Sequence, residues 1–490
     1  MGMTPVPADV DVVVAGSGAT GLAAAVTLAE GGATVAVFEK QRALGGTSNF
    51  FRGTFAVESE MQRERFIDYN RDDAFRKIME YSHWKANARL VRAIVNESAA
   101  TVAWLRDQGV TFTGQMTMMS GAPSTYHVVE GTGEAVVKAL ATQAKSKGVQ
   151  ILPGTPVVAL SKDGGRIKGV VVDDDGQEIA VASRAVVIAT GGYANNKEWI
   201  KKYTGYDLDV NLLAWGNTGK MGDGIRMAWE AGAAEDGVRS MEMIRVGPAG
   251  PEFAMGCSDV EVVAVQPDLW VTVRGERFCD ESVALCDTDS GNVNARLSGD
   301  GFTFSLFDDS IIDGLLEHGI ERSLGLMFLQ GYRPANVRKE MQAALSGGSK
   351  EVFVADSLEA LARSIQIDPV TLRATVDEYN HHCANGRDGL FAKDRRFLRP
   401  LVGPKYYAVK AHTASLGTMG GISINENMEV LDKKSAVIPG LYAGGFDAGG
   451  MYGDSYPISV SQGLSSAFAL NSGRIAGRSA LRYVQRVAGH

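Results

Sequence analysis

The stretch DVVVAGSGATG at residues 11–21 decides the fold of this 490-residue chain. Its apolar, β-branched start is typical of a buried strand. The alanine-rich run from Leu22 to Leu28, which follows the glycines, is typical of a helix, and Thr34 to Phe38 forms a second apolar strand pattern. We therefore predict a strand–helix–strand unit at the start of the chain.

Three glycines in this stretch form the pattern Gly-x-Gly-x-x-Gly, at Gly16, Gly18 and Gly21. In a dinucleotide-binding turn the first makes the tight turn, the second lets the backbone approach a pyrophosphate, and the third lets helix and strand pack closely. The helix N-terminus then offers N–H donors and the positive end of its dipole to the phosphates. Glu39, at the end of the second strand, is placed to accept both ribose hydroxyls and would repel a 2′-phosphate, which argues against NADP.

A second glycine element, Gly45 to Ser48, follows six residues after Glu39. Flavin proteins need backbone and hydroxyl groups there, near the diphosphate and the ribityl chain. The pattern Gly-x-Gly-x-x-Gly occurs once in this role, so we predict no second module for NAD(P)H. We predict non-covalently bound FAD, with electrons exchanged through a diffusible partner or a separate redox protein.

Composition narrows the possible partners. Hydrophobic residues make up 45% and charged residues 22% of the chain, which are globular proportions. The net charge of -8 has no basic block behind it, which argues against nucleic acid and against an anionic membrane surface. A small, uncharged or cationic partner is easier to accommodate.

Neither a membrane span nor a metal site is indicated by the sequence. No stretch reaches the ~18 uninterrupted apolar residues of a span, and Met1 to Asp9 lacks the features of a signal peptide. The four cysteines show neither metal-ligand spacing nor a paired framework; they are Cys257, Cys279, Cys286 and Cys383. We expect a cytoplasmic protein with reduced thiols and no metal.

The whole chain is predicted to divide into three parts. We predict a first FAD-domain segment at 1–243, a capping domain with short helices and loops at 244–399, and a second FAD-domain segment at 400–490. Helical spacing runs from Asp73 to Gly109, where Trp84 and Trp104 are expected in the core. Further elements are predicted as strands at 157–160, 167–172, 178–181, 185–189, 419–424 and 441–445, and as helices at 357–367 and 464–485.

Seven motifs in order resemble the fumarate reductase and succinate dehydrogenase flavoprotein family, from about Asp9 to Ala480. They are Gly16-x-Gly-x-x-Gly, Gly45-Gly-Thr-Ser, Ala189-Thr-Gly-Gly, Gly222-Asp-Gly, Arg274-Gly-Glu-Arg-Phe, Thr418-Met-Gly-Gly and Pro439-Gly-Leu-Tyr-Ala-Gly-Gly. The resemblance implies an α/β, Rossmann-like FAD domain of the glutathione-reductase type. It also implies an inserted α+β capping domain, with substrate between cap and isoalloxazine.

The motifs and the resemblance together give a set of expected flavin contacts. They are Gly16, Gly18, Ala19, Thr20, Gly21, Glu39, Lys40, Gly45, Gly46, Thr47, Ser48, Gly53, Val158, Thr190, Gly191, Gly192, Asp223, Gly445, Asp447, Gly463 and Leu464.

The substrate end departs from the family pattern. Fumarate-type members hold a dicarboxylate with two histidines and an arginine, and deliver the proton through another arginine. The matching positions here read Gly247, Gly417, Tyr456 and Leu285, none of which carries positive charge. Two carboxylates in an apolar cleft without paired cations would cost several kcal/mol each, so fumarate is a poor candidate.

The segment Asp454 to Pro457 is instead similar to the 3-ketosteroid dehydrogenase branch, where a Tyr-Pro pair holds a ketone oxygen. Tyr456 and a loop N–H near Val460 would then stabilise the enolate formed during hydride transfer. The alternative is a purely structural role, in which Tyr456 is a packed aromatic side chain beside a turn.

A second catalytic group must exchange a proton at the α-carbon. The tyrosine that ketosteroid dehydrogenases use corresponds to Leu285, so the candidates are Tyr126 and Tyr452, then Cys286 and Asp287. His412 also draws attention, whereas the His381–His382 pair lies in a polar helical stretch and is expected to face solvent.

We therefore predict an FAD-dependent reductase or dehydrogenase acting on a C=C bond conjugated to a ketone, in a small hydrophobic substrate such as a ketosteroid or another enone. Two alternatives remain: a reductase of another unsaturated acid, and a flavoprotein subunit of an electron-transfer complex.

Overall fold

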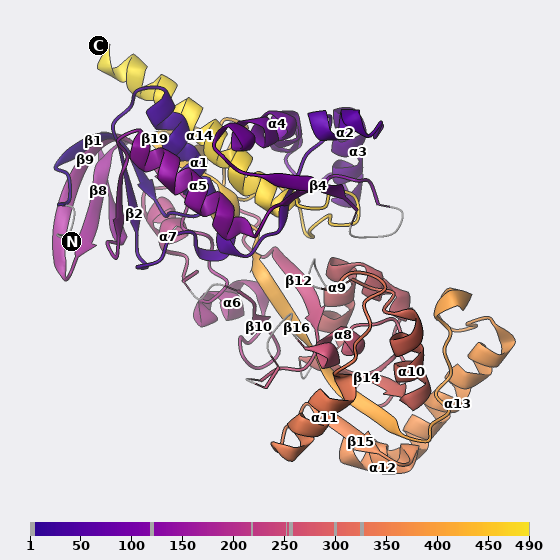
Figure 1. The fold of residues 1–490 in the computed structure, drawn as a ribbon. Coiled ribbons are helices and arrows are strands. Elements are labelled where there is room, and N and C mark those ends of the chain that lie inside the picture. Colours follow the sequence, from indigo (N-terminus) through magenta and orange to yellow (C-terminus); the bar gives the residue numbers. More distant parts are fainter. Residues whose placement is uncertain are drawn as a thin grey trace.

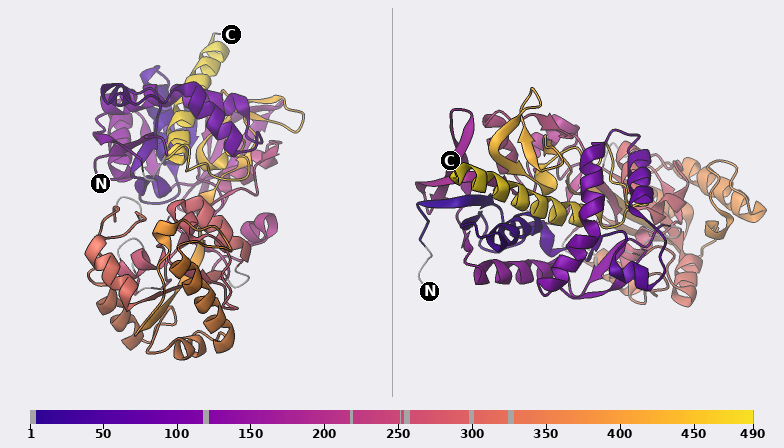
Figure 2. Two further views of the ribbon diagram at one scale, coloured as in Figure 1. Left: turned by 90° about the vertical axis from the view of Figure 1, so that its right-hand side faces the viewer. Right: turned by 90° about the horizontal axis from the view of Figure 1, so that it is seen from above.

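A computed structural model describes residues 5–117, 122–216, 219–250, 252–253, 258–297, 301–323 and 328–489. Figure 1 shows two bodies, an upper one that contains both ends of the chain and a lower one built from its middle. Strands β12 (Met241–Val246) and β16 (Tyr406–Thr418) lie where the two bodies meet and extend into the lower one. A turned view shows the same division (Figure 2).

The upper body is built on a sheet with the order β18-β19-β9-β1-β2-β6. Its strands from β19 to β6 run parallel to their neighbours. The predicted strand–helix–strand unit is therefore present, with its glycine turn at the carboxyl end of the sheet. The strands are β1 (Asp9–Ala15), β2 (Val35–Glu39), β6 (Gln150–Pro153), β9 (Gln177–Ile188), β18 (Glu429–Leu431) and β19 (Val437–Ala443).

Small residues let two helices of this body pack at close range. Helix α1 (Ala19–Glu30) contacts α14 (Leu464–Ala488) and also α5 (Gly133–Ser146). A Cβ added to Gly473 would lie 2.2 Å from the Thr20 carbonyl oxygen, and one on Gly477 would lie 2.9 Å from that of Ala24. The predicted closing helix thus holds the start of α1 in place under the glycine turn.

Strand β9 corrects one prediction. The segments 178–181 and 185–189, predicted as separate strands, form one 12-residue strand up to Ile188. Its first half pairs antiparallel with β8 (Arg166–Asp174), which also pairs with β7 (Val157–Asp163), whereas its second half pairs in parallel with β1. Because the partner strand changes, the burial pattern along β9 changes from alternating to continuous. In the sequence this change looks like a boundary between two separate strands.

The predicted helical region consists of α3 (Arg71–Tyr81) and α4 (Ala88–Asp107). Trp104 is buried as predicted, but the prediction for Trp84 is wrong because its side chain is 62% exposed. Trp84 lies in the link between the helices with φ at 59°, and its ring meets the Phe75 ring in an edge-on arrangement. The short helix α2 (Glu60–Glu64) and a three-stranded sheet of β3 (Gly53–Phe55), β5 (Tyr126–Val129) and β4 (Phe112–Met116) complete this region.

The lower body has its own sheet, in which β16 is the central strand. β16 pairs with β10 (Leu213–Ala214), β12, β14 (Phe302–Asp308) and β15 (Val352–Ala355), and β13 (Leu269–Val271) pairs with β14. The predicted helix at 357–367 is α12 (Leu358–Ser364), capped by Ser357. The other helices are α8 (Asp259–Ala264), α9 (Asp287–Leu297), α10 (Asp309–His318), α11 (Val337–Ser346) and α13 (Pro369–Asn385).

These pairings bear on the predicted domain limits. β16 begins after residue 399 and β12 begins before residue 244, so a segment 244–399 leaves out the central strand of its own sheet. We propose that the capping domain runs from 241 to 418. The chain re-enters the upper body through β17 (Gly421–Ile422), which pairs with β11 (Glu235–Asp236). Helices α6 (Lys197–Thr204) and α7 (Asp223–Glu230) precede the cap, and among the described helices none is both long and apolar enough to cross a membrane.

Candidate active site

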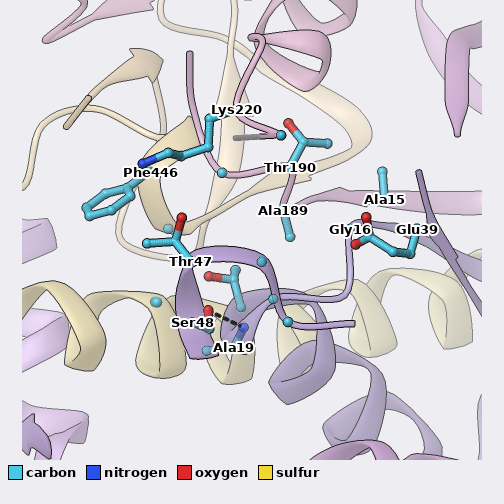
Figure 3. Close-up of a pocket in the computed structure, with 18 of the residues that line it drawn as sticks. Ala15, Gly16, Ala19, Glu39, Thr47, Ser48, Ala189, Thr190, Lys220 and Phe446 are labelled. Atoms are coloured by element: carbon cyan, nitrogen blue, oxygen red, sulfur yellow. Dashed lines mark hydrogen bonds between the residues drawn. The ribbon is translucent and has the colours of Figure 1, made fainter. Parts of the chain in front are cut away.

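A cavity of about 280 Å³ opens at the carboxyl edge of the first sheet. Figure 3 places Gly16 and Glu39 toward one end, Lys220 and Phe446 toward the other, and Thr47 and Ser48 between them. The walls come from both sheets, because Glu242 of β12 and Leu416 of β16 also line the cavity.

The fingerprint glycines behave as their spacing predicts. Gly16 has φ at 106°, and a Cβ there would lie 2.2 Å from the Ala189 carbonyl oxygen. A Cβ on Gly21 would lie 1.9 Å from the Gly16 carbonyl oxygen, so α1 could not approach the turn. Both glycines are required by close backbone packing.

Glu39 lines the cavity and is held in a defined orientation. One carboxylate oxygen accepts from the Ser17 N–H at 3.0 Å and the Ser17 hydroxyl at 2.7 Å, and the other accepts from the Gln41 N–H at 2.8 Å. A carboxylate offers about four acceptor positions. Acceptor capacity therefore remains for a ribose hydroxyl.

The N-terminus of α1 faces the middle of the cavity without a side-chain cap from its N-cap residue, Gly18. The Ala19 N–H donates to the Ser48 hydroxyl at 2.9 Å, which ties the second glycine element to the first (Figure 3). Backbone donors and a hydroxyl converge here as an anion site requires. The residues present therefore fit FAD: Glu39 would hold the adenosine, the backbone around Ser48 would hold the phosphates, and Phe446 would lie beside the ring system.

Two thirds of the predicted flavin contacts line the cavity. They are Gly16, Gly18, Ala19, Thr20, Glu39, Lys40, Gly45, Gly46, Thr47, Ser48, Thr190, Gly191, Asp223 and Gly445. The others, which are not among the lining residues, are Gly21, Gly53, Val158, Gly192, Asp447, Gly463 and Leu464. Val157 lines the cavity beside Val158, and Ser465 lines it just after Leu464.

Asp447, a predicted flavin contact, is bonded to the turn that begins at Thr190. It is fully buried, and its carboxylate accepts from the backbone N–H groups of Thr190, Gly191 and Gly192 and from the Thr190 hydroxyl. Burial raises its pKa, while these hydrogen bonds oppose that shift. Asp447 thus holds the Thr190 turn against the cavity from behind.

The three predicted catalytic tyrosines lie together, although none lines the cavity. The rings of Tyr452 and Tyr456 are 5.7 Å apart, and the Tyr452 hydroxyl is buried without a hydrogen-bond partner among the described residues. The Tyr456 hydroxyl accepts from the Ser465 N–H at 3.2 Å. Burial raises the pKa of Tyr456 above its ordinary value, and the nearby Glu242 and Tyr126 add to this.

The other sequence candidates are occupied elsewhere. The Val460 N–H, predicted as a donor to substrate, donates to the Pro457 carbonyl at 3.1 Å. Burial raises the pKa of the Cys286 thiol, which keeps it protonated and makes it a weak acid, and Asp287 is paired with Arg322. His412 of β16 bonds to Glu351, which directly precedes β15.

The expected solvated face is found for only one member of the histidine pair, because the His382 side chain is 15% exposed and its Nε2 lies 3.9 Å from the Asp388 carboxylate. His381 is exposed and bonds to Asn385 one turn further along α13, as expected for a solvated face. Of the four cysteines, Cys257 lies outside the described residues.

Two buried charged residues at the ring end of the cavity were missed from the sequence. Lys220 is 2% exposed and Glu242 5% exposed. Lys220 Nζ donates to the Leu416 carbonyl at 2.7 Å, and burial lowers the pKa of this lysine to about 8. Burial raises the pKa of Glu242 to about 8, with Lys220 acting against the shift. A single lysine or a single glutamate does not form a recognisable sequence motif, so the sequence did not single out these two residues.

The two glycines that match the family's histidines are closely packed. A Cβ on Gly417 would lie 2.8 Å from Cε2 of the Phe446 ring, and one on Gly247 would lie 2.8 Å from the Glu261 Cα. Phe446 also lines the cavity. An aromatic ring and a helix backbone therefore occupy the space where histidine side chains would start.

Comparisons with known proteins agree with this geometry. The family model described as FAD binding domain matches residues 11–459. The chain is 35% identical to a vinyl phenol reductase of Lactiplantibacillus plantarum, with 97% of each chain covered. It is 29% identical to a fumarate reductase (cytochrome) of Shewanella frigidimarina, covering 97% of this chain and 78% of that protein. The structure of a 3-ketosteroid delta1-dehydrogenase from Sterolibacterium denitrificans superimposes with a TM-score of 0.81 at 19% identity, covering 97% and 100% of the two chains.

Proposed function

We propose that this chain, which belongs to the FAD binding domain family, reduces the C=C bond of an uncharged substrate in which that bond is conjugated to an oxygen-bearing group. The family resemblance and the FAD cofactor predicted from the sequence are confirmed. The chain is an FAD-dependent oxidoreductase of the fumarate reductase family that acts on C=C bonds.

The observation that carries the proposal is the character of the ring end of the cavity. Phe446 fills the space beside Gly417, and the nearest charged lining residues are one lysine and one glutamate, Lys220 and Glu242. Lys220 is already bonded to a carbonyl, and Glu242, whose pKa burial raises to about 8, brings no positive charge that could pair with an anion. A dicarboxylate would lose its hydration there without gaining paired cations, whereas a flat, neutral substrate could pack against Phe446.

The work of the chain's own residues follows from this arrangement. Bound FAD, once reduced, supplies the hydride. Phe446 contributes an apolar wall that can orient a planar substrate and exclude water. Groups from both sheets face the same space, so closure of the cap on the cavity would assemble the site.

Two substrate types belong to the proposed class. We place vinyl phenols first, because the vinyl phenol reductase is 35% identical over nearly the full length of both chains. Enones come second, on the strength of Tyr456. Its hydroxyl accepts from the Ser465 N–H, so its own proton is available for a carbonyl oxygen.

Electrons for the reduction must come from outside the chain. Only one dinucleotide fingerprint is present in the sequence, and we propose that a diffusible donor or a separate redox protein reduces a non-covalently bound FAD. The electron-transfer-subunit alternative would share this donor but would lack turnover of a small substrate on its own.

Anaerobic stopped-flow experiments with the photoreduced holoenzyme test the proposal. We expect 4-vinylphenol, or failing that a 4-en-3-one, to reoxidise the flavin at least ~10²-fold faster than fumarate, because fumarate lacks the paired cations it needs. Reoxidation by fumarate alone would refute the proposal. Tyr456→Phe should slow the enone reaction by ~10² if the hydroxyl stabilises an oxyanion. An unchanged enone rate would leave Tyr456 a packed aromatic.

A further inference from the structure

Glu242 is aimed at the cavity by an irregularity in its strand. β12 pairs with β16 so that Glu242 lies opposite Gly417, and the register shifts between Glu242 and Met243. Such bulges re-aim side chains and are common beside active sites. Because Gly417 has no side chain, the Phe446 ring approaches this position, and both Glu242 and Phe446 line the same cavity.

The surroundings of Glu242 favour its protonated form. No described residue donates a hydrogen bond to its carboxyl group, and the side chain is 95% or more shielded from solvent. Four titratable groups face it: Lys220 favours ionisation, Asp287 opposes it, and Tyr452 and Tyr456 are neutral neighbours whose own pKa it raises. Buried carboxyl groups are normally hydrogen-bonded, so one that is not and that faces a ligand space calls for a ligand-directed role.

We propose that Glu242 is the acid that delivers the proton to a substrate carbon when the double bond is reduced. This inference rests on the proposed function. The O–H bond of Glu242 breaks as a C–H bond forms at one alkene carbon, and the other carbon receives a hydride from the reduced cofactor. The substrate gains two electrons and two hydrogens, FAD is left oxidised, and water reprotonates the carboxylate.

Lys220 is placed to stabilise the Glu242 carboxylate that proton transfer leaves behind, and it takes no direct part in the proton transfer to carbon. Its Nζ is fixed on the Leu416 carbonyl, next to the residue opposite Glu242. The ammonium group is thus near the carboxylate that proton transfer leaves behind. In a buried site that proximity lowers the cost of forming the anion.

The test compares Glu242→Gln with Glu235→Gln, an exposed glutamate on β11, in the photoreduced holoenzyme. We expect Glu242→Gln to slow flavin reoxidation by 4-vinylphenol at least ~10²-fold, since general acids contribute 10²–10⁴. Oxidation by ferricyanide, which needs no proton on carbon, should stay within about threefold, and FAD content should be unchanged. Glu235→Gln should match the wild type in every measurement. Glu242→Asp, which keeps an acid, should restore part of the rate.

The pH dependence separates a chemical role from a structural one. Only the protonated acid donates, and its pKa is raised to about 8, so the wild-type rate should be level below that pH and fall above it. The Gln variant should be slow at every pH. Equal rates of variant and wild type with 4-vinylphenol would overturn the inference while leaving the proposed function intact.

The proposed function can fail separately. If fumarate alone reoxidises the wild type, the uncharged substrate is refuted, and a ~10² loss in Glu242→Gln with fumarate would still support the acid. If none of the three compounds reacts, the oxidised flavin is titrated from pH 6 to 10. A spectral transition near pH 8 that Glu242→Gln abolishes supports a titrating acid beside the flavin, and its absence from the wild type overturns the inference.

Discussion

Two sets of buried opposite charges lie in different parts of the molecule and differ in their hydrogen bonds. In the cap, the Arg277 guanidinium donates to both Glu281 oxygens and to Asp388, each at 2.7 Å, and Lys393 Nζ lies 3.2 Å from Glu281. At the cavity, Lys220 donates to a carbonyl, and Glu242 receives no donor from the described residues.

Hydrogen bonds, and not burial, account for the difference in pKa between the carboxyl groups of the two sets. Burial opposes ionisation of Asp388, but hydrogen bonds from Arg277 and from the backbone of Leu390 and Phe391 hold its pKa well below the ordinary value. Burial alone dominates at Glu242 and raises its pKa to about 8. The cap set is therefore a permanently charged structural network, and the cavity set can exchange a proton near neutral pH.

The comparison also assigns a role to a family motif. Arg277 belongs to the Arg274-Gly-Glu-Arg-Phe motif, and its guanidinium lies over the rings of Tyr379 and Phe391 at 5.0 and 5.2 Å while it holds Glu281 and Asp388. The motif thus holds part of the cap together, far along the chain from the glycine turns that face the cofactor.

The largest expected effect is on stability, from Glu281→Gln. The substitution leaves Arg277 and Lys393 buried without their shared carboxylate, which should cost about 3–5 kcal/mol, or roughly 6 °C or more in Tm. Glu242→Gln should not lower the Tm at pH 7, because the folded carboxyl is already neutral and unbonded, and the amide removes the cost of protonating it on folding. Thermal unfolding followed by circular dichroism at pH 7 measures both. Equal Tm values for the two variants would contradict the distinction between the sets.

An intermediate effect is expected on the pH dependence of Tm. In the folded protein the pKa of Glu242 is raised from its ordinary value of 4.5 to about 8. The contribution of Glu242 to the free energy of unfolding is therefore fully present below pH 4.5 and is lost as the pH rises toward about 8. The Tm of Glu242→Gln should therefore gain at least ~2 °C on the wild type between pH 5 and 8.

Asp388 should show the opposite sign. Its pKa is lowered from 3.8, so its contribution is present above that pH and is lost as the pH falls further. The deficit of Asp388→Asn should be full at pH 6 and should shrink below pH 4. Parallel pH profiles for the two variants would show that the sets do not differ.

Local patterns predicted the frame of the molecule well. Within the glycine turn, Gly21 is required by the carbonyl of Gly16, a few residues earlier in the chain, and the motif set led to the confirmed family and cofactor. Predictions were wrong where tertiary partners decide, as in β9, whose two halves face different strands, and Trp84, which a turn lifts into solvent.

The catalytic end was harder to predict for the same reason. The sequence named Tyr126, Tyr452 and Tyr456, and the structure brings them together, although whether they act in catalysis stays a prediction. Glu242 gave no signal, because its importance comes from a bulge, a glycine across the sheet and a ring from residue 446. Those contacts join segments about 170 to 200 residues apart in the chain.

The smallest effect is expected from Glu276→Gln, which breaks an ion pair one residue from Arg277. Arg274 and Glu276 meet at 2.9 Å, close to the 2.7 Å of Arg277 and Glu281, but their side chains are 74% and 54% exposed instead of 3% and 0%. Water and salt already solvate these charges, so the loss should be below about 1 kcal/mol. Thermal unfolding at 20 mM and 500 mM salt checks this, with Glu281→Gln as the matched change, and a small deficit should vanish at high salt. A loss of stability as large as that of Glu281→Gln would mean that the proximity of opposite charges is enough to stabilise this region of the cap. Burial and hydrogen bonding would then not explain why the charged set around Arg277 differs from Lys220 and Glu242 at the cavity.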